Sequence, residues 1–204
     1  KIEDAGADSI CIKDMAGLLR PHAATLLIDE LRSRLDLPIH LHTHDTAGVQ
    51  AATLLKASEA DVDIVDCAFA SMSGVTSQPS LEGMVAALQN TPRDTKLNPE
   101  LLTPFSHYWE TVRQYYEPFE SDLRSATAEV YVNEIPGGQY SNFRPQAASL
   151  GLGDRWSETK RAYADADKLF GGIVKVTPSS KVVGDLALFM VANNLSSSDV
   201  ESRA

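Results

Sequence analysis

Short apolar runs rich in β-branched residues alternate with helix-like segments along the first ninety residues. Three runs fit buried strands: residues 8–13, 38–42 and 62–68. Three amphipathic or capped segments predict helices between and after them: residues 20–35, 48–58 and 80–89. The strands recur every 25–30 residues or so, roughly the spacing of consecutive units in a parallel (β/α)8 barrel.

The pattern changes after residue 95, where helical periodicity continues without intervening strands. Four further helices are expected at residues 99–116, 140–150, 157–169 and 181–192. The predicted fold class is therefore α/β. Residues 1–95 would form the last three β/α units of a (β/α)8 TIM barrel, and residues 96–204 a mainly helical extension at its mouth. Three strands cannot close a barrel and the chain begins with Lys1, so we expect a piece of a longer polypeptide.

The candidate chemistry lies at the ends of the first two predicted strands. His42 and His44 alternate along one strand, so their imidazoles can share one face as a pair of metal ligands. Lys13 ends the preceding strand, and strand ends of a parallel barrel line a single open face. His40 lies on the same alternation, and we expect it in the core or supporting the ligands.

The composition of the chain disfavours some classes of binding partner. The net charge is −10, and no basic stripe is present to neutralise phosphates, which disfavours nucleic acid and anionic membranes. No apolar run approaches the roughly 20 residues that a membrane-spanning helix needs. Cys11 and Cys67 both lie in apolar runs, so two reduced, buried thiols are predicted. The aromatic residues of segment 99–116 are expected to pack.

Five segments resemble the carboxyltransferase domain of the pyruvate carboxylase family of biotin-dependent enzymes, in order and at compatible spacing. They are residues 11–17 (CIKDMAG), 42–48 (HTHDTAG), 71–80 (SMSGVTSQPS), 133–142 (NEIPGGQYSN) and 175–185 (KVTPSSKVVGD). The resemblance implies that Lys13 is carboxylated on its side chain and ligates a divalent metal, Mn or Zn, together with His42 and His44. It also implies that Thr177 shuttles a proton between biotin and pyruvate.

The resemblance further places Gln139, Ser180 and Lys181 around the carboxybiotin and the reacting groups. It implies transfer of a carboxyl group from carboxybiotin to pyruvate, giving oxaloacetate, with ATP used only by a separate domain. The implied partners are a biotin carrier domain and further copies of the protein in a tetramer. The implied compartment is the cytoplasm, or the mitochondrial matrix in a eukaryote. A fourth ligand and the substrate-holding residues would lie upstream, so these residues alone should be inactive.

Other interpretations remain open at this point. An oxaloacetate decarboxylase or transcarboxylase subunit uses the same barrel, although such relatives often carry Ala where this chain has Asp45. A lyase of the hydroxymethylglutaryl-CoA type also uses His-x-His-Asp but lacks the lysine ligand. A non-enzymatic assembly fragment is the third alternative. Thr177 and Ser180 could instead serve as turn or cap residues before a helix, and Gln139 could bond the Gly-Gly turn.

Overall fold

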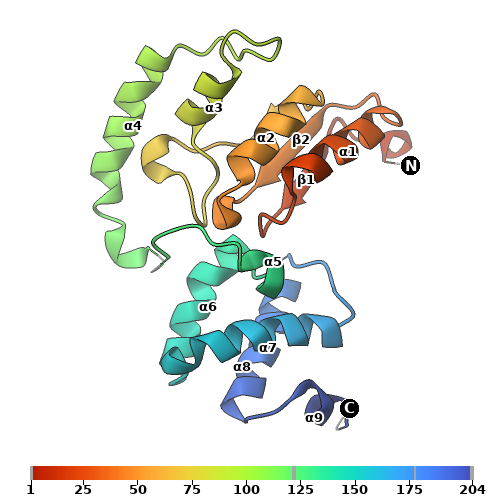
Figure 1. Ribbon diagram of the computed structural model, residues 1–204, viewed down its shortest axis with the longest axis vertical. Helices are drawn as coiled ribbons and strands as arrows, with labels where there is room; N and C mark the ends of the chain where they lie inside the picture. Colours follow the sequence, from red (N-terminus) through yellow and green to blue (C-terminus); the bar gives the residue numbers. More distant parts are fainter. Residues whose placement is uncertain (1, 121–122, 177, 203–204) are drawn as a thin grey trace. The chain divides into compact units, whose positions relative to one another are not determined.

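A computed structural model describes residues 2–120, 123–176 and 178–202. The chain has an α/β fold, rich in helix, with one small parallel sheet (Figure 1). It divides into two compact units, Lys1–Thr127 and Ala128–Ala204. The sheet and the predicted metal-binding histidines belong to the first unit, and the second unit is helical.

The sheet of the first unit contains three parallel strands in the order β1-β2-β3. They are β1 (Ile10–Asp14), β2 (Ile39–Thr43) and β3 (Ile64–Val65). All three runs predicted from the sequence thus contribute a strand, but the third is only two residues long. Beyond Val65 no further described residue is assigned to the strand, and Ala68 forms an isolated parallel bridge with Ser80.

Three helices cover one face of the sheet: α1 (Pro21–Arg32), α2 (Gln50–Glu59) and α3 (Leu81–Leu88). Their apolar sides meet the fully buried Ile39 and Leu41 of β2 in one continuous core. Removal of this surface from water is the main force that holds the unit together. Ser80 caps α3 as predicted, because its hydroxyl accepts the backbone N–H of Gly83 at 3.2 Å. Two short 3-10 turns, η1 (Glu3–Ala5) and η2 (Asp45–Ala47), complete this part.

The opposite face of the sheet carries the alternate residues, and these are polar or only partly buried. Lys13 and Cys11 of β1 are exposed there, while His40 and His42 of β2 are half-buried. The prediction of two buried cysteines was therefore wrong, since Cys67 is also only half-buried, although both thiols are free. Burial and the nearby charge of Asp66 raise the pKa of Cys67 to about 12, which keeps it a thiol.

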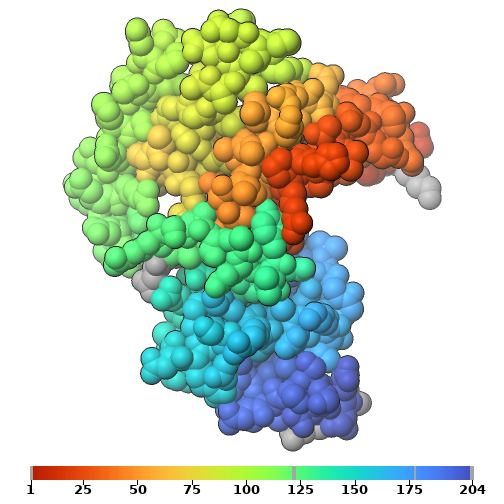
Figure 2. All heavy atoms as spheres, in the orientation of Figure 1, coloured from red at the N-terminus to blue at the C-terminus, as the bar shows by residue number. Residues whose placement is uncertain are grey.

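The helix α4 (Pro99–Arg113) belongs to the first unit, whereas the sequence placed the change of organisation after residue 95. It packs on the 3-10 turn η3 (Ala70–Met72) and on α3, and Arg113 donates a 2.6 Å hydrogen bond to the Ser71 carbonyl. Figure 2 shows this helix, in light green, on the surface of the unit. The aromatic residues of segment 99–116 pack only in part: Phe105 stacks on Phe69 with ring centroids 5.8 Å apart, whereas Tyr108 and Tyr115 are 59% and 78% exposed.

The second unit is a helical cluster. It contains α5 (Val130–Asn133), α6 (Gly137–Ser149), α7 (Trp156–Leu169), α8 (Ser179–Ala192) and α9 (Ser197–Glu201). The 3-10 turn η5 (Gly153–Arg155) precedes α7, whereas η4 (Glu117–Phe119) still belongs to the first unit. The aromatic core of the second unit places Phe143 against Trp156 and Tyr163, with ring centroids 5.6 Å and 5.5 Å apart. Within the described residues, no helix is long and apolar enough to cross a bilayer.

A buried ion cluster joins α5, α7 and the segment before α8. The ammonium of Lys175, 13% exposed, lies 2.8 Å from Asp167 and 2.9 Å from Glu134. Burial alone would lower the pKa of Lys175, but the hydrogen bonds to the two carboxylates raise it above its usual value. Burial and the same two carboxylates also raise the pKa of Tyr163.

Alkaline pH should destabilise the second unit. Lys175 and Tyr163 both hold their protons more tightly in the folded than in the unfolded chain, so stability is complete below about pH 10 and falls above it. Each proton involved contributes a slope of up to about 1.4 kcal/mol per pH unit. Urea unfolding followed by circular dichroism between about pH 8 and pH 11 measures this loss. Tyr163→Phe should make the decline shallower, and an unchanged slope would contradict the assignment.

Candidate functional site

The side chains of His42 and His44 meet at the carboxyl end of β2. His42 is the next-to-last residue of β2, and His44 immediately follows the strand. Because the two are separated by one residue, both side chains project from the half-buried face of the sheet. Their Nε2 atoms are 3.2 Å apart, and their rings stand nearly perpendicular with centroids 5.1 Å apart. The structure thus brings the two predicted ligands together.

The other ring nitrogen of each histidine faces an acceptor. Nδ1 of His42 lies 2.6 Å from a carboxylate oxygen of Asp66, and Nδ1 of His44 lies 2.6 Å from the backbone carbonyl oxygen of Thr76. Neither acceptor carries a proton to donate. A carbonyl oxygen has none, and hydrogen bonds from His42 and His40 outweigh burial and hold the pKa of the Asp66 carboxyl below its usual range. Each Nδ1 therefore carries a hydrogen, so the Nε2 of each ring in its neutral form would present a lone pair.

This arrangement fits a divalent metal ion. Two lone pairs 3.2 Å apart repel each other unless a proton or a metal ion lies between them. Two nitrogens bound to one Zn²⁺ at tetrahedral angles lie about 3.3 Å apart. Burial, offset in part by the Thr76 carbonyl, lowers the pKa of His44, which favours the neutral ring that a metal requires.

Lys13 is the residue of β1 that pairs with His42 in the sheet register. Partners in a parallel ladder project on the same face, so the Lys13 side chain rises beside the histidine pair. It is exposed, and no pairing with a carboxylate is seen for it within the described ranges. Across residues 2–120, 123–176 and 178–202, no group of three or more His, Cys, Asp or Glu side chains is arranged to hold a metal. Among the described residues, Lys13 is the side chain of another type that stands beside the histidine pair.

The end of β1 and the turn that follows it contact the strand end that carries the histidines. Asp14 accepts hydrogen bonds from the backbone of Leu18 and Leu19 and from the hydroxyl of Thr43 at 2.8 Å. Gly17 has φ +70°, and a side chain at this position would meet the His44 carbonyl oxygen at 2.2 Å. Only glycine allows the two backbones to approach so closely. The close contact of Gly17 with the His44 backbone thereby fixes the position of His44 relative to β1.

The loop that follows β3 supplies the carbonyl that holds His44. Val75 has φ +47°, which is a strained conformation for a β-branched residue. The Gly74 and Gln78 backbones close the loop with a 2.8 Å hydrogen bond, and Asp45 donates its N–H to the Ser77 carbonyl at 2.8 Å. The loop is therefore locked to the segment after His44, with the Thr76 carbonyl aimed at the ring.

The remaining predicted site residues lie in the second unit. Gln139 is half-buried in the first turn of α6, and its amide packs on Gly184 of α8, where a Cβ would lie 3.0 Å from Nε2. Ser180 is buried at the start of α8, and Lys181 is exposed and pairs with Asp185 at 2.6 Å. Ser179 bonds the backbone of Val174 and Val176 ahead of the helix, and among the described residues α8 has no side-chain hydrogen bond at its N-cap, Pro178. Thr177 lies outside the described residues.

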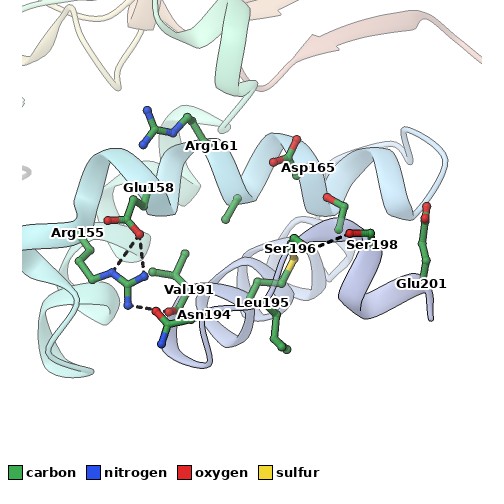
Figure 3. Close-up of a pocket in the computed structure, with 13 residues that line it drawn as sticks. Arg155, Glu158, Arg161, Asp165, Val191, Asn194, Leu195, Ser196, Ser198 and Glu201 are labelled. Atoms are coloured by element: carbon green, nitrogen blue, oxygen red, sulfur yellow. Dashed lines mark hydrogen bonds and ion pairs between the residues drawn. The ribbon is translucent and has the colours of Figure 1, made fainter. Parts of the chain in front are cut away.

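A surface pocket of about 780 Å³ also lies in the second unit, between α7, α8 and α9 (Figure 3). Arg155 lines it and is held by Glu158 at 2.7 Å and by the Val191 carbonyl at 2.8 Å. None of the predicted site residues that the structure describes borders this pocket. Arg155 is already paired with Glu158, and the pocket lies apart from the described candidate residues, so it is not the candidate site.

Two partners of the histidines were missed by sequence reasoning. Asp66 sits within an apolar run and Thr76 acts through its backbone, so neither stands out as a motif. The register of the sheet explains the place of Asp66: β2 and β3 pair His40 with Ile64 and Leu41 with Val65, and the next step of that register reaches His42 and Asp66. His40, expected as a supporting residue, contacts Asp66 at 2.8 Å.

Two family models match the chain. One described as HMGL-like matches residues 1–107, and one described as a conserved carboxylase domain matches residues 130–204. Pyruvate carboxylase from Bacillus subtilis is 52% identical over 200 residues, and that from Staphylococcus aureus is 56% identical over 200 residues. The human mitochondrial pyruvate carboxylase is 50% identical over 203 residues. Each match covers 98% of this chain but only 17% of the relative.

Solved structures give the same result. The carboxyl transferase domain of Rhizobium etli pyruvate carboxylase matches with a TM-score of 0.96 and 55% identity, covering 98% of this chain and 33% of that one. The same domain solved with pyruvate and biocytin matches equally well. The chain therefore spans about a third of that domain and about a sixth of the curated relatives.

Proposed function

The chain belongs to the HMGL-like family and is homologous to the carboxyltransferase domain of pyruvate carboxylases, and on this premise we propose that it forms part of a carboxyltransferase site. The reaction would move a carboxyl group from carboxybiotin to pyruvate and give oxaloacetate. The observation that carries this proposal is the His42–His44 pair, whose two Nε2 lone pairs converge at 3.2 Å. The close relatives named pyruvate carboxylase give the pair its chemical context.

The three β/α units would be the last three of a (β/α)8 barrel. Their helices lie on one face of the sheet, and the face with Lys13 and the histidines lacks a helical layer within the described residues of the first unit. The inner face of a barrel sheet has this arrangement. In that setting the ends of β1 and β2 would open toward the substrate.

His42, His44 and a carboxylated Lys13 would hold a divalent metal, Mn or Zn. An ammonium repels a cation, whereas a carbamate on the same nitrogen provides an oxygen donor, so carboxylation would convert Lys13 into a ligand. When bound, the metal supplies Lewis-acid stabilisation of the negative charge that develops on pyruvate as it loses a methyl proton. With Nδ1 of each ring directed to an acceptor, the two Nε2 atoms would be the donors to the metal.

The second unit would provide the groups that handle biotin. Thr177 would carry the proton from the pyruvate methyl group to the biotin nitrogen that loses its carboxyl group. Gln139, Ser180 and Lys181 would hold carboxybiotin and the reacting groups. Residues 96–204 would thus act as the extension that completes the active site. In the whole protein, a carrier domain would deliver the carboxybiotin, and a separate domain would consume the ATP. The protein would form a tetramer in the cytoplasm or the mitochondrial matrix.

His44→Ala in the protein that carries this chain tests the proposal. Bound Mn or Zn, measured by elemental analysis, should be lost, and carboxylation of pyruvate should fall to background. Bicarbonate-dependent ATP cleavage should persist, because that step belongs to another domain. His107→Ala, a replacement on the exposed surface of α4, should change none of these quantities. Retained metal together with normal carboxyl transfer in His44→Ala would refute the proposal.

A further inference from the structure

We propose that Asp66 is a positioning residue that fixes His42 as a metal ligand, and that His40 fixes Asp66 in turn. The inference rests on the proposed function, since it concerns the same metal centre. Asp66 accepts from both rings at once: one carboxylate oxygen lies 2.6 Å from Nδ1 of His42, and the other lies 2.8 Å from Nε2 of His40. The three side chains form a continuous chain across β2 and β3.

The backbone places Asp66 where it can do this. Its N–H bonds the Leu41 carbonyl at 3.1 Å, which continues the β2–β3 ladder by one residue beyond Val65. The carboxylate therefore projects on the face shared by His40 and His42. Its position is set by the sheet and not by a mobile loop, so the ring of His42 is held against a rigid support.

The chemistry of the two ligands then differs. A carboxylate accepts from His42, whereas a neutral peptide carbonyl accepts from His44. A charged acceptor draws the Nδ1 proton more strongly and makes the opposite nitrogen a better donor to a metal. We therefore expect His42 to be the stronger ligand of the pair and Asp66 to account for the difference.

His40 completes the arrangement without serving as a ligand. Its Nε2 is occupied by the second oxygen of Asp66, so it points along the sheet to the carboxylate and not to the Nε2 pair. By holding that oxygen, His40 stops the carboxylate from turning away from His42. The side chains of His40, His42 and Asp66 are 28%, 23% and 36% exposed, so water competes only partly for these bonds.

The test uses the full-length protein and measures the affinity for Zn²⁺ and Mn²⁺ by competition with a chelator. Asp66→Ala removes the charge and the acceptor, and should weaken metal binding by about 10- to 100-fold. Asp66→Asn keeps an amide oxygen that can accept from Nδ1 of His42 but loses the charge. Its metal affinity should lie between that of the native protein and that of Asp66→Ala. His40→Phe should weaken binding less than Asp66→Ala, because the carboxylate remains.

Asp63→Asn is the matched control for a purely structural effect. Asp63 also lies beside β3 and bonds the Ile39 backbone at 2.6 Å and the Arg32 guanidinium, but it touches neither ligand. This variant should lose stability and keep the native metal affinity. Native affinity in Asp66→Ala, or an equal loss in Asp63→Asn, would overturn the inference. Loss of metal in His44→Ala alongside native affinity in Asp66→Ala would refute this inference and leave the proposed function standing.

Discussion

Gly17→Ala should lower the free energy of unfolding around β1 and β2 by about 2–5 kcal/mol. The left-handed backbone of Gly17, with φ +70°, costs any other residue energy, and its new Cβ would lie 2.2 Å from the His44 carbonyl oxygen. The obstacle is a backbone oxygen of the residue that follows β2, so it cannot turn aside as a side chain would. The segment that carries His44 must move, and the spacing of the two Nε2 atoms must change with it.

Hydrogen–deuterium exchange of peptides covering β1, β2 and η2 measures this loss, because it reports local opening within a large protein. Gly74→Ala is the matched control. Gly74 has φ +84°, but nothing lies within 4 Å of its Cβ position, so only the conformational cost of about 1–2 kcal/mol applies. Equal effects of the two replacements would show that the approach of Gly17 to His44 carries no energy of its own.

The helices of the first ninety residues were predictable because their stripes of apolar residues match the 3.6-residue period. The predicted segment 20–35 contains α1 and the predicted segment 80–89 contains α3, with Ser80 as the cap. The short helices α5 and α9 were missed, since four or five residues are too few to show a period. The third strand was predicted too long, because an apolar run shows that a segment is buried but not where its ladder ends.

The histidine pair was predictable from the period of two along a strand, but its supports were not. Asp66 and the Thr76 carbonyl act through the pairing of β2 with β3 and through a strained turn at Val75. Register and backbone conformation are set by tertiary packing, so a single sequence shows neither. Exposure follows the same logic: Cys11 reads as a core residue in its apolar run, yet it lies on the face of the sheet that the helices leave open.

Lys175 begins the segment 175–185, but its partners Glu134 and Asp167 lie 41 and 8 residues away in the sequence. Their meeting depends on how α5 and α7 pack. Asp167 is the critical member, since its side chain is 9% exposed and its second carboxylate oxygen has no hydrogen bond within the described part of the chain. The ammonium of Lys175 is therefore the principal compensation for a buried negative charge.

Lys175→Met should accordingly lower the local stability of α7 and α8 by about 3–5 kcal/mol. The methionine fills a similar volume, so the loss comes from the charge of Asp167, which would remain buried beside Tyr163 without its counter-ion. Hydrogen–deuterium exchange of peptides covering residues 156–192 measures the change. Lys168→Met is the matched control: that side chain is 79% exposed and lies 3.6 Å from Asp165, so its loss should cost less than about 1 kcal/mol.

A second replacement separates charge from packing. In Lys175→Met with Asp167→Asn, the uncompensated charge is gone, and most of the lost stability should return. Failure of the double variant to recover would show that Lys175 acts through the packing of its aliphatic chain instead. The outcome also bears on the proposed site, because Lys175 stands two residues before Thr177 and anchors the segment that leads into Ser180 and Lys181. A buried ion pair at this place would hold the residues proposed to bind carboxybiotin to the helical unit.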